Sequence, residues 1–167
     1  MSDEFWVGEY FEGDGVDAAH INVVAGPRSG PAGLTFTQAL TQPSPGHVPF
    51  LTVLRPSVPV KPFTVFVPKV PPGGELHGRA TWGAAQLGVA KGVHEAVERN
   101  VLPAQAGEGW VLTVPVWVDP DVADLDAVYR NNVVATREAL RNALTGRPTP
   151  DEMREAAAAP RNPFYST

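Results

Sequence analysis

The sequence feature that most constrains the fold is an alternation of side chains over residues 19–25. Successive side chains of a β-strand point to opposite faces of its sheet. One face of this strand would carry Ala19, Ile21, Val23 and Ala25. The other face would carry His20, Asn22 and Val24. Because Asp14-Gly15 is a turn signal just upstream, we expect a turn that leads into a strand with one buried face.

His20 and Asn22 are the first candidate functional pair. They would lie about 7 Å apart on one face, since a strand rises roughly 3.3 Å per residue. An imidazole titrates near neutral pH, and an amide both donates and accepts hydrogen bonds, so the pair could handle a proton beside a polar ligand. The alternative interpretation is a strand-end histidine that only contacts solvent, and this stretch alone leaves both open.

Length and composition indicate a single domain with a small-molecule or protein partner. The chain has 167 residues, of which 43% are hydrophobic, and this suffices for one sizeable core. Its 13 basic and 18 acidic residues form no basic block, which argues against nucleic acid or an anionic membrane as the main partner. The chain has no cysteine, so disulfides and thiolate metal sites are excluded, and its four histidines show no metal-ligand spacing. Because no apolar run approaches membrane-spanning length and the polar start is not a signal peptide, we expect a soluble, cytoplasmic protein.

The remaining patterns predict strands and helices in an order typical of an α+β fold. Besides the first-mentioned strand, strands are expected at residues 5–11, 48–55, 63–67 and 110–118. Helices are expected at residues 31–40, within residues 75–100, and from the Asp119-Pro120 pair to Gly146. With little regular βαβ alternation, this order predicts a two-layer sandwich in which helices cover one face of a mixed sheet. Residues 1–146 would form the domain, and residues 147–167 a tail of the same domain, loosely held or lying as an arm on a neighbour.

Helical spacing assigns the inward faces of these helices. The first would direct Leu34 inward, with Ala39 or Leu40. The second would present a stripe of Trp82, Gln86, Val89, Val93 and Val97. The third would present Val122, Leu125, Val128, Tyr129, Asn132, Val133, Thr136, Leu140 and Leu144. The polar Gln86 needs a partner within its apolar stripe, and a ligand, water or the backbone could supply one.

Lys69 stands on a proline-rich loop directly after the strand expected at residues 63–67. Proline cannot donate a ladder hydrogen bond, so the loop would leave the sheet and be stiff. Such loops commonly carry binding groups, although a lone loop lysine can also be simply solvated. The glycine-rich residues 26–31 lack the Gly-Lys-Ser/Thr ending of a phosphate-binding loop, so a structural turn is the better interpretation there.

A series of short motifs runs through most of the chain. They are Val7-Gly8-Glu9, Gly13-Asp14-Gly15, Ala19-His20-Ile21, Gly26-Pro27-Arg28, Lys61-Pro62, Lys69-Val70, Ala85-Gln86, Gly88-Val89-Ala90, Val101-Leu102-Pro103 and Asn162-Pro163-Phe164. In this order and spacing the sequence resembles the formaldehyde-activating enzyme family, the 5,6,7,8-tetrahydromethanopterin hydro-lyases of one-carbon metabolism.

This resemblance implies a fold of the ribosomal protein S5 domain 2-like type, assembled as a homopentamer with each site near a subunit boundary. His20 matches the family's proposed general acid. The residues at substrate-contacting positions are Leu51, Lys69 and Gln86. Asn22 occupies the place of the family's substrate-binding Asp, and Pro71 that of a substrate-contacting Thr. Tetrahydromethanopterin or a related reduced pterin would be the co-substrate, with no metal and no tightly bound cofactor.

The implied reaction is the condensation of formaldehyde with the pterin, which also serves formaldehyde detoxification. Formaldehyde adds to a secondary amine to give a carbinolamine, whose hydroxyl leaves as water once an acid such as His20 protonates it. Unlike a carboxylate, the amide of Asn22 offers one acceptor and presents its own donor. The sequence therefore leaves open a paralogue that acts on another amine or carbonyl compound, and a non-catalytic ligand-binding or sensing module.

Overall fold

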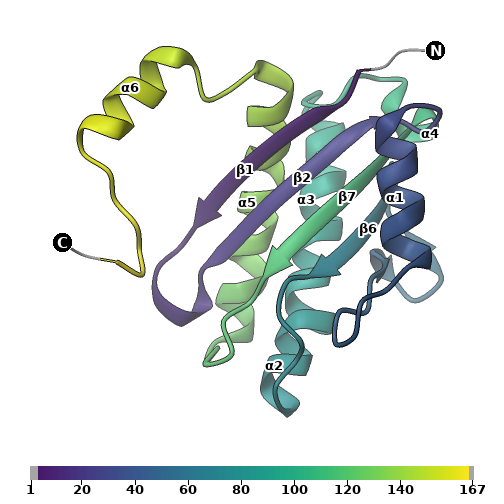
Figure 1. The fold of residues 1–167 in the computed structure, drawn as a ribbon. Coiled ribbons are helices and arrows are strands. Elements are labelled where there is room, and N and C mark those ends of the chain that lie inside the picture. Colours follow the sequence, from purple (N-terminus) through teal and green to yellow (C-terminus); the bar gives the residue numbers. More distant parts are fainter. Residues whose placement is uncertain (1–3, 166–167) are drawn as a thin grey trace.

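The central element of the structure is a five-stranded sheet with the spatial order β1-β2-β7-β6-β3 (Figure 1). A computed structural model describes residues 4–165 of the chain. The strands of this sheet are β1 (Trp6–Glu12), β2 (Ala19–Pro27), β3 (Phe50–Leu51), β6 (Phe63–Pro68) and β7 (Trp110–Trp117). β6 and β7 run parallel, whereas the other neighbouring pairs are antiparallel. The sheet is therefore mixed, as the sequence predicts.

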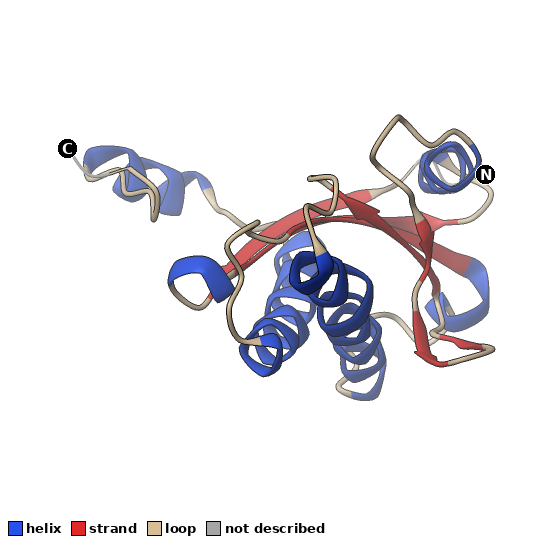
Figure 2. Cartoon of the chain, turned by 90° about the horizontal axis from the view of Figure 1, so that it is seen from below, coloured by secondary structure: helices blue, strands red, loops and turns tan. Residues whose placement is uncertain are grey.

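Two long helices cover one face of the sheet. The helices are α1 (Pro31–Thr41), α2 (Glu75–Arg79), η2 (Ala80–Ala85), α3 (Gln86–Glu98), α4 (Ala106–Gly109), α5 (Leu125–Thr145), α6 (Pro150–Ala158) and the short η1 (Gly15–Asp17). α3 and α5 lie side by side on one face, and α1 lies on the opposite face (Figure 2). The structure confirms the expected α+β fold, and the expectation that helices share one face holds for α3 and α5 but not for α1.

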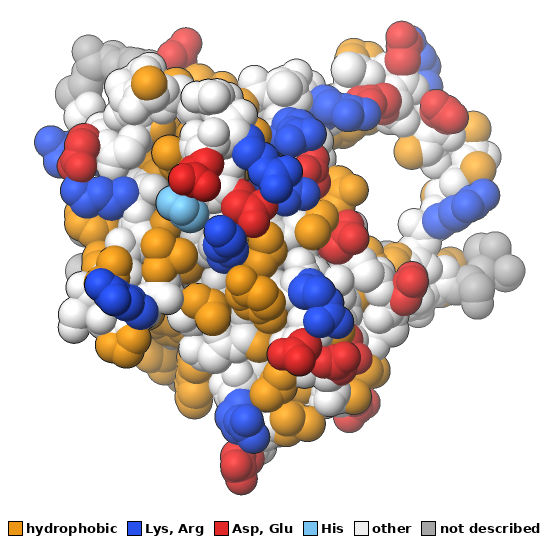
Figure 3. Space-filling view, turned by 180° about the vertical axis from the view of Figure 1, so that it is seen from behind, with side chains coloured by type: hydrophobic (Ala, Val, Ile, Leu, Met, Phe, Trp, Pro, Cys, Tyr) orange, Lys and Arg blue, Asp and Glu red, His pale blue; other side chains and the backbone are white. Residues whose placement is uncertain are grey.

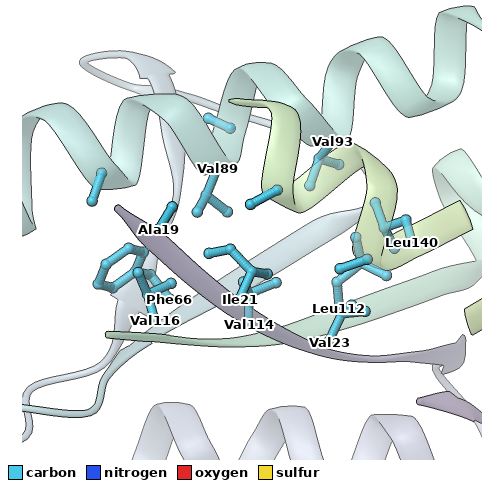
Figure 4. Packing of buried hydrophobic residues seen from close by; sticks show 14 of the residues in the cluster. Ala19, Ile21, Val23, Phe66, Val89, Val93, Leu112, Val114, Val116 and Leu140 are labelled. Carbon is cyan, nitrogen blue, oxygen red and sulfur yellow. The ribbon is translucent and has the colours of Figure 1, made fainter. Parts of the chain in front are cut away.

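The core lies between the sheet and the helix pair α3–α5. All four residues of the predicted apolar face of β2 are fully buried, namely Ala19, Ile21, Val23 and Ala25. They pack with side chains from β6, β7, α3 and α5, among them Phe66, Leu112, Val89 and Leu140 (Figure 4). Burying each large apolar side chain contributes roughly 1.5 to 3 kcal/mol. The alternation in β2 is thus tied to the core, and its second face must point the other way.

α1 packs on the outer face through small residues, and this overturns the prediction for Leu34. Ala32 and Gly33 are buried, whereas Leu34 is 61% exposed. A Cβ atom on Gly33 would lie 1.9 Å from the carbonyl oxygen of Arg28, so only glycine fits there. The close approach of α1 at its first turn decides which side of the helix faces the sheet.

The helix around Gln86 differs from a regular α-helix. α2, η2 and α3 follow one another without a break, and η2 is a π-helical turn. A π-turn holds more residues than an α-turn, which shifts the side chains before it around the axis. Gln86, Val89 and Val93 are buried as predicted, but Trp82 is 50% exposed and Val97 is 37% exposed at the far end. The predicted stripe is therefore correct only in its middle.

α5 begins later than its sequence signals suggest. The N-cap is Asp124, whose side chain accepts hydrogen bonds from the N–H groups of Asp126 and Ala127. Asp119 instead closes a local turn by accepting from the N–H of Asp121. Asp17 also accepts from the N–H groups of residues 123 and 124, which holds that segment outside the helix. The predicted stop is confirmed, since Gly146 has a φ of 68° as the C-cap.

The last part of the chain forms an arm, which we define as residues 147–165. Its helix α6 starts with a capping box between Thr149 and Glu152 and contains no buried residue. In the space-filling view an opening separates the arm from the body (Figure 3). Whether the arm lies on a neighbour stays a prediction. None of the helices within residues 4–165 is long and apolar enough to span a membrane.

Close contact between α3 and α5 makes a test of this packing possible. A Cβ atom on Gly92 would lie 2.7 Å from the carbonyl oxygen of Val133, whereas one on Gly83 would meet nothing within 4 Å. Gly92→Ala should lower the free energy of unfolding by about 1 to 3 kcal/mol through overpacking, although alanine favours helix. Gly83→Ala, the matched control, should leave it unchanged or raise it by up to about 1 kcal/mol. Urea unfolding measures both, and equal effects of the two substitutions would contradict this account of α3–α5 packing.

Candidate functional site

The outer face of β2 carries the candidate catalytic group at the end of the sheet that α1 does not cover (Figure 1). His20 lies opposite Phe11 on β1 and Trp117 on β7. Asn22 lies opposite Glu9 on β1. Because directly paired residues share a face, the pairing of β2 with β1 and β7 brings two aromatic rings and two polar side chains around His20.

His20 contacts a carboxylate that belongs to one of the short motifs but was not among the candidate site residues. Its Nε2 atom lies 3.0 Å from Oε1 of Glu9. The side chains are 38% and 56% exposed, so both remain accessible to a ligand. The ring centroid of Phe11 lies 6.1 Å from that of His20. The imidazole is thus held between a carboxylate and an aromatic ring while one side stays open.

Lys69 reaches the same place from the other side of β7. Its main-chain N–H donates to the carbonyl oxygen of Val116 at 2.9 Å, which fixes the first residue after β6 to the sheet. Its side chain donates a hydrogen bond to Oδ1 of Asn22. Burial lowers the pKa of the Lys69 ammonium, and the carboxylate of Glu9 opposes that shift. We call Glu9, His20, Asn22 and Lys69 the His20 cluster.

Gln86 and Leu51 line a different part of the molecule. The buried Gln86 accepts from the N–H of Val53 at 2.9 Å and donates to the carbonyl oxygen of Val53 at 3.2 Å. Backbone is thus the partner that its position in the apolar stripe requires. The expected strand at residues 48–55 is broken here, because β4 (Val53–Arg55) pairs with β5 (Val58–Pro59) instead of β6. A hollow of about 420 Å³ is lined by Val48, Phe50, Leu51, Val53, Trp82 and Gln86.

The structure brings three of the five predicted site residues together and leaves two apart. β7 and β6 lie between β2 and β3, and neighbouring strands are about 4.8 Å apart. Asn22 and Leu51 are therefore separated by about 14 Å across the sheet. His20, Asn22 and Lys69 form one group, while Leu51 and Gln86 form the wall of the hollow at the other edge.

Two further contacts near His20 escaped the sequence analysis. The hairpin register would have placed Glu9 beside His20 if the two strands had been aligned, since both point to the outer face. Phe164 of the arm lies in no strand whose register would have predicted its position. Its ring lies 6.2 Å from that of Phe11 and 5.2 Å from that of Trp117, both in edge-to-face geometry. No local pattern in the polar tail indicates that contact.

No metal centre is formed by the part of the chain that the structure describes. Among residues 4–165, no group of three or more His, Asp or Glu side chains is arranged to hold a metal ion. What the site does offer is an imidazole, an amine, an amide and a carboxylate on an open sheet face beside aromatic rings. Such a set suits a small organic ligand and the movement of a proton.

Comparisons with known proteins identify the family of the chain. Residues 7–165 match the model of the family described as formaldehyde-activating enzyme (Fae), and the chain belongs to this family. The resemblance drawn from the short motifs is thereby confirmed.

Named relatives are similar over almost the whole chain. The bifunctional enzyme Fae/Hps of Methanothrix thermoacetophila is 42% identical over 149 residues, which are 89% of this chain and 38% of that protein. The 5,6,7,8-tetrahydromethanopterin hydro-lyase of Methanosarcina barkeri is 37% identical over 158 residues, which are 95% of this chain and 89% of that protein. The chain spans only 38% of the length of the first of these relatives.

The bonds of Gln86 predict that this residue supports the fold as well as the hollow. Gln86→Ala would leave the N–H and carbonyl groups of Val53 without their partner. Unsatisfied buried polar groups cost roughly 1 to 3 kcal/mol, and we expect a loss of this size in the free energy of unfolding. Gln38→Ala, on the exposed side of α1, should change it by less than about 0.5 kcal/mol. Thermal unfolding of both variants would disprove the role of Gln86 if the two were equally stable.

Proposed function

We propose that this protein condenses formaldehyde with tetrahydromethanopterin, or a related amine, to the methylene adduct with loss of water. The observation that carries the proposal is the His20 cluster on an open face of a chain that belongs to the formaldehyde-activating enzyme family. The relative from Methanosarcina barkeri, which is named a tetrahydromethanopterin hydro-lyase, supports the choice of amine. The reaction would be a carbon-oxygen lyase step of one-carbon metabolism.

His20 would act as the general acid. Loss of hydroxide from the carbinolamine is slow, and an imidazolium that protonates the departing oxygen removes that barrier. Glu9, 3.0 Å from Nε2, would hold the ring and pass back to it the proton that the second amine of the pterin releases when the methylene bridge closes. The iminium so formed is closed by the second amine of the pterin. Lys69 would meet an anionic or carbonyl group of the substrate.

The wall formed by Leu51 and Gln86 would complete the site from a second protomer. Leu51 lies about 14 Å across the sheet from Asn22, and Gln86 lies on α3 outside the sheet, so one chain would not surround a small ligand with both groups. An assembly in which the hollow of one protomer faces the His20 cluster of the next would do so, and a homopentamer is the arrangement we propose. Gln86 keeps one N–H and one acceptor site free for a ligand beyond its bonds to Val53. We place the reaction in the cytoplasm, where it would also remove free formaldehyde.

Asn22 favours a second candidate function. A carboxylate would accept two N–H groups from a pterin edge, whereas the amide offers one acceptor, which Lys69 already uses. A different amine or carbonyl substrate would suit this neutral partner. A ligand-binding module without turnover would need only the hollow and the aromatic rings.

The role of His20 predicts a large and selective loss of activity. His20→Ala should lower the rate of methylene-tetrahydromethanopterin formation from formaldehyde by about 10² to 10⁴ fold relative to the unaltered protein. His94→Ala is the matched control, because His94 also faces a glutamate, Glu98 at 3.6 Å, but on α3. Its rate should stay unchanged. Activity that survives the His20 substitution removes this residue from the mechanism.

The same assay with other amines in place of the pterin distinguishes among the candidate functions. Turnover of other amines but not of the pterin would favour the paralogue. Calorimetric binding of the pterin without any turnover would favour the ligand-binding module.

A further inference from the structure

The environment of Lys69 differs from that of the other two lysines in the chain. Lys61 contacts both carboxylate oxygens of Glu108, at 2.7 and 2.8 Å, and is largely exposed. Lys91 lies 3.9 Å from Glu95 on the surface of α3. Lys69 instead points into the His20 cluster and donates to the neutral amide of Asn22. Among the residues that the structure describes, it makes no ion pair with a carboxylate.

The charges around Lys69 leave its ammonium poorly compensated. Glu9 on β1 is the acidic group that faces it, and that carboxylate is already 3.0 Å from His20 on β2. Burial therefore prevails over the attraction of Glu9, and the pKa of Lys69 lies below its usual value. The neutral amine is the form of lysine that attacks a carbonyl carbon, and the lowered pKa raises the fraction of Lys69 in that form.

The geometry points to a covalent role, and we propose that the amine of Lys69 captures formaldehyde as an iminium beside His20. This inference rests on the proposed function for the identity of the aldehyde. It makes Lys69 a nucleophile that carries the one-carbon unit, in addition to any contact it makes with the amine substrate.

The steps balance without an oxidant or a metal. The lone pair of Nζ forms a bond to the carbon of formaldehyde, and a proton passes from nitrogen to oxygen to give the hydroxymethyl amine. His20 protonates the hydroxyl, the C–O bond breaks, water leaves, and the nitrogen lone pair forms the C=N bond of the iminium. The substrate amine then adds to that carbon and transfers its proton to Nζ. The C–Nζ bond breaks, which frees neutral Lys69 and leaves the iminium on the substrate.

Reductive trapping without any pterin tests the capture step alone. The protein is treated with formaldehyde and cyanoborohydride at pH 7, and methylation of each lysine is followed by peptide mass spectrometry. Lys69 should be methylated faster than Lys61 and Lys91, since burial lowers the pKa of its ammonium and a lower pKa raises the neutral, reactive fraction of the amine. A rate for Lys69 that is equal to or below theirs overturns the proposal.

Asn22→Asp is a nearly isosteric change, and it tests whether the neutral partner of Lys69 is the cause of its reactivity. A carboxylate beside Lys69 holds the ammonium charged, so the methylation rate of Lys69 should fall about tenfold or more, while Lys61 and Lys91 keep theirs. An unchanged rate at Lys69 contradicts the proposed origin of its reactivity.

Lys69→Arg tests whether the condensation reaction requires capture of formaldehyde by the amine of residue 69. The guanidinium keeps the charge and a donor for Asn22 but forms no iminium with formaldehyde under these conditions, so condensation should be lost, whereas Lys61→Arg should retain it. Full activity of Lys69→Arg overturns the covalent route and leaves the role of His20 intact. If Lys69 is trapped selectively but the protein does not convert the pterin, the capture step is supported and tetrahydromethanopterin is ruled out as the substrate.

Discussion

The two-residue period of β2 is the constraint on which the rest of the structure depends. Ile21 and Val23 are fully buried against α3 and α5, so a slip by one residue would expose them and bury His20 and Asn22 instead. The energy of the core thereby fixes the direction of the polar side chains. β1 and β7 extend the same register to Glu9 and Trp117. The site lies on the outer face because the inner face of β2 is occupied by the core.

The helix pair sets the other half of the candidate site. α3 approaches α5 closely at Gly92, and Gln86 at its start bonds β4 through both ends of the side-chain amide. The π-turn of η2 precedes Gln86 and turns Trp82 outward, so the indole lines the hollow and not the core. One irregular turn therefore supplies both a structural bond and an apolar wall. The strands β7 and β6, which lie between β2 and β3, separate this hollow from the His20 cluster.

Sequence reasoning succeeded where one physical rule dominated. The alternation of β2 follows from strand periodicity, the stop at Gly146 from glycine at a helix end, and the mixed sheet from the order of the predicted elements. It failed where two rules competed. Asp119 is a good N-cap in isolation, but Asp17 from a distant turn holds residues 123 and 124 outside the helix. Leu34 lost its inward position because Gly33 lets the backbone of α1 approach Arg28. The contact of Lys69 with Asn22 joins residues 47 positions apart and has no local sequence signal.

The edge-to-face contacts of Phe164 both attach the arm to the body and cover aromatic rings beside His20. The ring rests on Phe11 and Trp117, and these are the residues that flank His20 across the sheet. α6 touches nothing that buries it, so this aromatic latch joins the returning end of the arm to the body. Loss of the Phe164 contact would free the end of the arm and would also expose more of the two rings beside His20.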